Sequence, residues 1–155
     1  MWYRRAILAG LSASIVMGIW EMVAEQLAGG NGFWAPVTYI AATVLRDYQE
    51  VAAPVSFAVL PVVLGLMAHM MNSIVLGIVF ALVVRRMTTS LNETIGLGAV
   101  FGAVVMLLMW LLVDPVMLRL NALSFLMAHV MWGIVLGLSL GWGPGVQRTL
   151  SRAHV

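Results

Sequence analysis

The sequence contains no cysteine and no lysine, and charged residues make up only 9% of its 155 positions. The absence of cysteine excludes disulfide bonds, thiolate metal sites and cysteine nucleophiles. Soluble domains carry about 25% charged residues, so a water-exposed surface cannot be built from this composition. The eight arginines and six acids are also too few and too scattered for a nucleic-acid interface. We therefore expect no nucleic-acid partner.

Hydrophobic residues dominate what remains, at 63% of the chain, against about 45–50% in soluble domains. A helix that crosses a bilayer needs roughly 20 mostly apolar residues. Four stretches meet this requirement, at about 6–24, 55–84, 94–113 and 122–142. The sequence therefore predicts an all-α integral membrane protein, a four-transmembrane-helix bundle with residues 1–155 in one domain and the lipid bilayer as its main partner.

The long connection between the first two spans predicts a further short helix at about 35–46. Pro36 suits a first helical turn, and one face of the segment is apolar through Val37, Ile40, Ala41, Val44 and Leu45. This pattern is typical of an amphipathic helix that lies in the membrane interface. The apolar run that follows, 51–84, is too long for one upright span, so we expect the second helix to start or bend at Pro54 or Pro61.

The arginines predict the orientation, because cytoplasmic segments of membrane proteins keep positive charge. One side of the membrane receives six of the eight: Arg4, Arg5, Arg85, Arg86, Arg148 and Arg152. Both termini are therefore predicted to be cytoplasmic, in a bacterial inner (plasma) membrane. The acids near the outer side, Glu25, Asp47, Glu50 and Asp114, are expected to be solvated ends of the bundle.

An internal repeat is the most informative feature. Residues 66–77 and 126–137 are identical at nine of twelve positions, which predicts two similar helical hairpins related by a pseudo-twofold axis along the membrane normal. Small residues recur at every fourth position and allow helices to approach closely in lipid. These stripes include Gly10, Ser14 and Gly18; Ser73 and Gly77; Gly98 and Gly102; and Gly133, Gly137 and Gly141.

Three titratable residues are predicted to lie at one depth inside the membrane. His69 lies 16 residues before Arg85, and Glu21 lies 16 residues after Arg5, so each is about 24 Å from the inner edge at 1.5 Å per helical residue. The repeat brings His129 to the same level. Titratable residues in a span are costly and mark functional sites by default, and Asn72 is expected to support the histidines from one turn deeper.

Several roles remain open for this group. His69 and His129 with Glu21 as third ligand suit a divalent metal ion, and the two histidines alone could hold a haem b for electron transfer. The structural alternative is that each histidine donates to a carboxylate or a backbone carbonyl of a neighbouring helix and only fixes helix register. A small proton-linked carrier that uses the same three groups as a relay is the third possibility.

The histidine segments 69–77 and 129–137, together with the Gly-Phe-Trp-Ala-Pro segment 32–36, resemble a loose group of small four-helix bacterial inner-membrane proteins. This resemblance implies a fold and a location, and no activity. With little mass outside the bilayer, the chain has scant room for a catalytic domain, so we expect no enzyme. The leading expectation is a non-catalytic accessory or assembly subunit, as a homo-oligomer or with other membrane subunits.

Overall fold

A computed structural model describes residues 2–87, 90–112 and 118–141, and these are helical with no strand. The four long helices are α1 (Trp2–Ala24), α3 (Val59–Met87), α4 (Leu91–Leu112) and α5 (Ala122–Gly141). Each is long and apolar enough to cross a membrane, which confirms the four predicted helices. The predicted ends of the third and fourth, at 113 and 142, lie outside the described residues.

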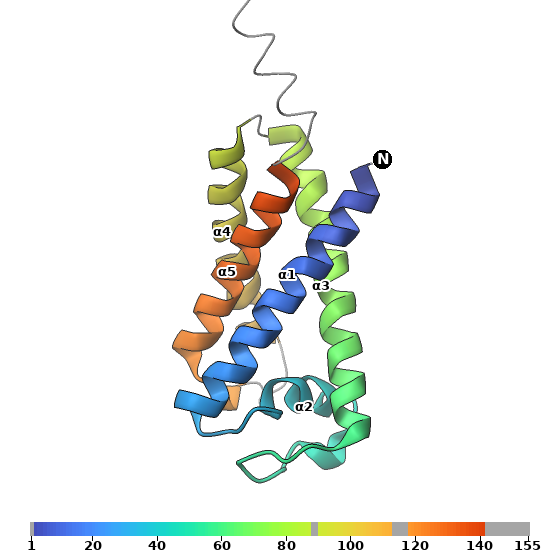
Figure 1. The fold of residues 1–155 in the computed structure, drawn as a ribbon, viewed down its shortest axis with the longest axis vertical. Coiled ribbons are helices and arrows are strands. Elements are labelled where there is room, and N and C mark those ends of the chain that lie inside the picture. Colours follow the sequence, from blue (N-terminus) through green and yellow to red (C-terminus); the bar gives the residue numbers. More distant parts are fainter. Residues whose placement is uncertain (1, 88–89, 113–117, 142–155) are drawn as a thin grey trace, which may run out of the picture.

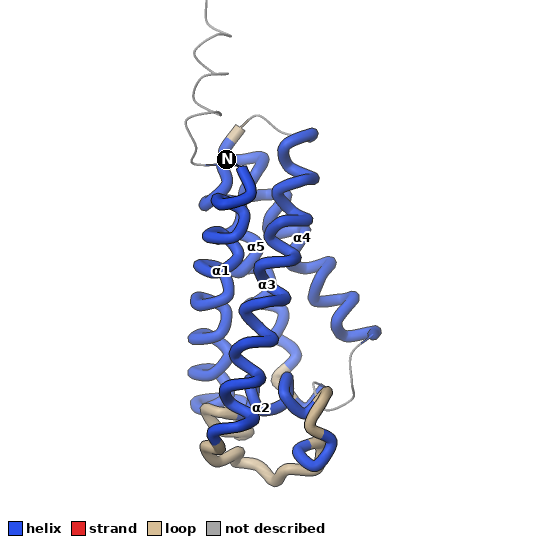
Figure 2. Tube along the Cα trace, turned by 90° about the vertical axis from the view of Figure 1, so that its right-hand side faces the viewer, coloured by secondary structure: helices blue, strands red, loops and turns tan. Residues whose placement is uncertain are grey.

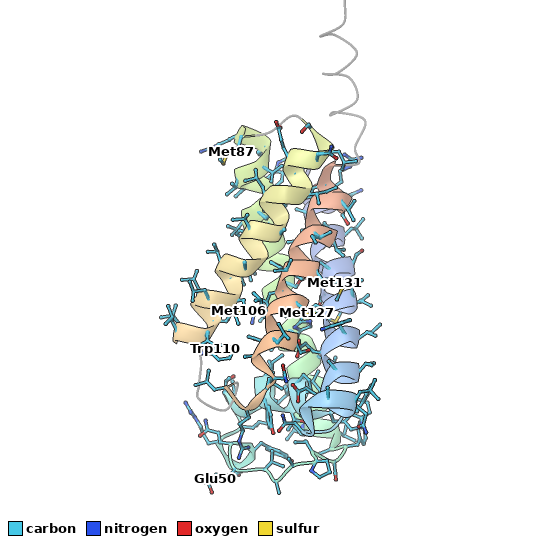
Figure 3. All side chains as sticks on the ribbon, turned by 90° about the vertical axis from the view of Figure 1, so that its left-hand side faces the viewer. Glu50, Met87, Met106, Trp110, Met127 and Met131 are labelled. Carbon is cyan, nitrogen blue, oxygen red and sulfur yellow. The ribbon has the colours of Figure 1, made fainter. Side chains whose placement is uncertain are left out.

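The long helices form an elongated bundle in which α1 lies between α3 and α5, while α4 packs on the other side of α5 (Figure 1). The N-terminus and the end of α3 lie together, and the short helix α2 (Ala35–Ala42) lies beneath the opposite end. We call the latter the α2 end. Figure 3 shows Met87 and Glu50 at these two opposite ends.

The two hairpins use the same backbone contacts. A Cβ atom added at Gly10 of α1 would lie 2.7 Å from the carbonyl oxygen of Ser73, and one added at Gly98 of α4 would overlap the carbonyl oxygen of Gly133. Gly133 is 60 positions after Ser73, which is the spacing of the sequence repeat. Gly98 is 88 positions after Gly10, so the helices of the first hairpin are farther apart in the sequence than those of the second. The small-residue stripes therefore lie where backbones meet, as expected for helices packed in lipid.

The ends of the first two spans differ from the sequence prediction. Beyond Ala24, α1 continues as the π-helical segment η1 (Glu25–Gly29), which turns at Gly30 with a φ of 76°. Helix α3 begins at Val59, later than predicted, and Pro61 lies within its first turn. Pro61 therefore marks the start of the helix, because proline has no amide hydrogen to donate and the first turn requires none.

Helix α2 is shorter and more enclosed than the predicted interfacial helix. It ends at Ala42, and the separate 3-10 turn η2 (Arg46–Tyr48) follows. All of its residues except Ile40 are buried, including Thr38 and Tyr39. The predicted short helix is therefore present, but it ends four residues earlier than 46, and it is enclosed in the bundle instead of exposing a polar face.

Outward-facing side chains on the long helices are large and apolar. The exposed residues of α3 and α4 include Met67, Met71, Val75, Val100, Leu107 and Leu111. A monomeric soluble protein rarely exposes apolar surface of this extent. The distribution suits a helical bundle surrounded by lipid.

Candidate functional site

His69 lies in α3 and contacts α1. Its Nε2 is 3.1 Å from the backbone carbonyl oxygen of Ser14. A carbonyl oxygen only accepts, so Nε2 carries the hydrogen, and in the neutral imidazole Nδ1 keeps the lone pair. His69 thus makes the interhelical hydrogen bond that the structural alternative describes. Within the described ranges Nδ1 has no hydrogen-bond partner.

His129 in α5 is held by its own helix. Its Nδ1 is 2.8 Å from the carbonyl oxygen of Phe125, one turn earlier, and the Phe125 ring packs edge-on against the imidazole with 4.3 Å between centroids. Nδ1 is therefore the donor, and Nε2 has a lone pair with no partner among residues 2–87, 90–112 and 118–141. Histidines that bind metals are oriented in this way, by a carbonyl that accepts from the other ring nitrogen.

Glu21 is buried at the junction of α1 and α5, with 3% of its surface exposed. Its Oε1 accepts from the Ser124 hydroxyl at 3.2 Å, whereas Oε2 has no partner in the part of the chain that the structure describes. Glu21 and His69 together line a small cavity of about 30 Å³. This volume is sufficient for one water molecule, which would give Oε2 a partner.

The three predicted residues are brought together in part. His69 and Glu21 line the small cavity, while His69 and His129 line a larger one that Glu21 does not reach. No group of three histidine or acidic side chains within the described residues is placed to hold a metal ion. The two histidines also present different nitrogens, because Nε2 of His69 is bonded to Ser14 and Nε2 of His129 is not.

The larger cavity has a volume of about 570 Å³, within the range of about 300–1,000 Å³ of ligand sites. It lies between α3 on one side and α4 with α5 on the other. Figure 2 shows α4 leaning away from α3 toward the α2 end, and these two helices make few contacts. The wall on α3 consists of Ala68, His69, Asn72, Ser73 and Leu76, and the opposite wall includes Val105, Met109, Trp110, Phe125, His129 and Trp132.

Different side chains border the cavity toward its two ends. At the α2 end, Ile40, Thr43 and Arg46 line it. Toward the other end, the Trp132 indole donates to the Ser73 hydroxyl at 2.6 Å, and Phe101 stacks on the Trp132 ring with 5.8 Å between centroids. The sparse contacts between α3 and α4 leave room for a sideways approach between these two helices.

Asn72 does not support His69 as the sequence predicted. It is exposed and lines the cavity, and its amide has no hydrogen-bond partner among the described residues. An unpaired amide within an apolar span is costly, so a polar group of a ligand would be its natural partner. The sequence repeat gave no indication of an unpaired amide at position 72, because the equivalent position in the second copy is the buried Trp132.

The predicted position of Glu25 is wrong. It was expected at a solvated rim but is fully buried, with Oε1 accepting from the backbone amide of Asn121 and Oε2 from the Asn31 side chain, both at 2.7 Å. Both partners are polar groups of loops at the α2 end. Asp47 and Glu50 are exposed as expected, and Asp114 lies outside the described residues.

Comparison of the chain with protein-family models, with curated proteins and with solved structures finds no match. The functional argument therefore rests on the cavity and on the polar groups around it.

Proposed function

We propose that this protein is a non-catalytic accessory module of a bacterial inner membrane, with both termini cytoplasmic, which holds a hydrophobic ligand or cofactor inside the bilayer. The single observation that carries the proposal is the environment of His129. One ring nitrogen is fixed by the Phe125 carbonyl, and the other has no partner among the described residues. The imidazole is 5% exposed and lines a cavity of about 570 Å³. A ligand with a donor hydrogen would pair with this nitrogen.

The same site gives little support to a proton-linked carrier. A carrier needs polar groups on both sides of its binding site. The sequence contains no titratable residue between Arg5 and Glu21, or between His69 and Arg85. The titratable layer therefore has no continuation toward the arginine-rich side, as suits a site that binds and holds its ligand.

A metal ion bound by His69, His129 and Glu21 gains no support from the geometry, because Glu21 does not line the cavity of the two histidines. Haem is the alternative ligand, and His129 would be one of the residues that hold it. Haem ligation through Nε2 of His69 would require that imidazole to leave the Ser14 carbonyl. An accessory role in a larger complex fits the proposal, since a binding module without a catalytic domain would serve another protein.

A cavity-filling variant tests the proposal. Ala68 lines the cavity and is half-buried, so Ala68→Phe places a ring inside it. Val104→Phe adds the same ring to an exposed position of α4 and is the matched control. The proteins are purified in mild detergent, and their absorbance spectrum, metal content and organic extract are compared. We expect a co-purifying molecule in the wild type and in Val104→Phe that is lost in Ala68→Phe. Identical extracts from all three, with no absorbing group, would contradict the proposal.

A further inference from the structure

The groups that line the large cavity select for a particular ligand chemistry. Nε2 of His129 and Nδ1 of His69 are the ring nitrogens that are not bonded to a carbonyl, and in the neutral imidazoles both are hydrogen-bond acceptors. The Asn72 amide, which can donate and accept, lines the same cavity. A ligand that pairs with one of these nitrogens must bring a donor hydrogen, and a second polar atom of the ligand would pair with the amide.

The position of the cavity within the bundle indicates what the non-polar part of the ligand must be like. Helices α3 and α4 diverge toward the α2 end and make few contacts, which leaves room for a ligand to enter between them (Figure 2). Leu76, Val105 and Met109 line the cavity beside the polar groups. A ligand that arrives from the bilayer must be soluble in lipid, and its polar head must be small enough to enter a mostly apolar cavity.

The charged residues around the cavity indicate the net charge of the ligand's polar head. No acidic side chain within the described ranges lines the cavity, so nothing there would balance a cationic head. Arg46 lies at the α2 end of the cavity, where an anionic lipid head would approach it. The imidazole of His129 is buried and that of His69 is half-buried, and an ionised group beside them would need a charged partner to offset its desolvation. The deep part of the site therefore suits a neutral head.

On these grounds we propose that the cavity binds a membrane quinol, a neutral aromatic head with two hydroxyl groups on a lipid-soluble tail. One hydroxyl donates to Nε2 of His129, the Asn72 amide contacts the other, and the tail leaves between α3 and α4. Trp110, Phe125 and Trp132 line the cavity and provide aromatic surface for the ring. This inference rests on the proposed function and adds the chemical class of the ligand.

The experiment measures binding of a decyl-substituted benzoquinol, kept reduced under anaerobic conditions. Wild-type protein in phosphatidylcholine nanodiscs is incubated with the probe, and bound quinol is compared with that in empty nanodiscs by chromatography of the extracts. We expect saturable binding of about one quinol per protein, in keeping with one cavity of this size. The dimethyl ether of the same quinol keeps the shape and has no donor hydrogen, so it should bind at least about tenfold more weakly.

Three cavity variants and one control variant locate the site. His129→Asn keeps an amide that can donate to the Phe125 carbonyl and removes the cavity nitrogen, so quinol binding should fall about tenfold while thermal stability is retained. Asn72→Leu should also weaken binding, because it removes an exposed amide and leaves the helix packing unchanged. Val104→Phe should bind like the wild type, and Ala68→Phe should lose binding altogether.

The outcomes separate this inference from the proposed function. Equal affinity for quinol and dimethyl ether, with loss in Ala68→Phe, would overturn the quinol assignment and leave a cavity that binds hydrophobic molecules. A stable haem spectrum that depends on His129 would do the same, as would binding that appears only when phosphatidylglycerol is added. Failure of both probes to bind, with no difference between Ala68→Phe and the wild type, would overturn both proposals.

Discussion

Trp132 and Ser73 join α5 to α3 inside the bundle, through a hydrogen bond of 2.6 Å from the indole Nε1 to the hydroxyl oxygen. The same hydroxyl donates to the carbonyl oxygen of Gly10 in α1 at 2.7 Å. One side chain thus links three helices at the floor of the cavity. The arrangement depends on the difference between the two repeat copies, because position 72 of the first copy is asparagine where the second has Trp132.

Ser73→Ala should destabilise the bundle by about 1–3 kcal/mol, because the buried indole N–H loses its acceptor and the Gly10 carbonyl loses its second donor. The unfolding midpoint in mixed micelles measures the change. Ser139→Ala, at an exposed position of α5, is the matched control and should leave the midpoint unchanged. Equal midpoints for both variants would show that this link adds no stability.

Gly98 and Gly96 in α4 give a second, sharper comparison. A Cβ at Gly98 would overlap the Gly133 carbonyl oxygen, whereas one at Gly96 would meet nothing within 4 Å. Gly98→Ala should therefore force α4 and α5 apart and lower the unfolding midpoint strongly. Gly96→Ala should raise stability by up to about 1 kcal/mol, the usual preference for alanine in a helix. Destabilisation by Gly96→Ala, or tolerance of Gly98→Ala, would contradict the packing.

The long helices could be predicted from the sequence because their signal is local. Runs of apolar residues and small residues at every fourth position depend only on neighbours in the chain, and the stripe through Gly98 and Gly102 does face Gly133 and His129. The hydrogen bond of His69 to a neighbouring helix could also be predicted from the sequence. A histidine on a helix face that packs closely against another helix has backbone carbonyl oxygens within reach.

Other features could not be predicted because they depend on distant contacts. Glu25 is buried by a partner 96 positions away, the amide of Asn121, and nothing near Glu25 in the sequence indicates this. The enclosure of α2 also depends on where α3 starts, as the close approach of Val37 to Gly65 illustrates. The cavity results from the divergence of α4 from α3, which is a property of helix angles and not of residue spacing.

Glu25 should hold the loops of the α2 end in place. Glu25→Ala removes the acceptor of both Asn31 and Asn121, so their amide-bearing groups lose a buried partner at a cost of about 1–3 kcal/mol. Hydrogen exchange of the backbone amides of residues 118–123 should rise in this variant. Glu50→Ala, at an exposed acid of the same end, should leave exchange unchanged. Unaltered protection in Glu25→Ala would mean that the loops are held by other contacts.

His69→Leu tests how much of the role of His69 is structural. The lost hydrogen bond to Ser14 joins α3 to α1, and interhelical bonds of this kind contribute about 0.6 kcal/mol on average. Because the Ser14 carbonyl lies within α1 and keeps its helical partner, the destabilisation should stay near this small value. His69→Gln places an amide donor near the position of Nε2 and should recover most of it. Met67→Leu, on the exposed face of the same helix, controls for altered packing in the micelle.

If the role of His69 is purely structural, His69→Gln should restore stability and leave ligand retention by the purified protein intact. Restored stability with lost retention would instead assign Nδ1 of His69 to the cavity ligand.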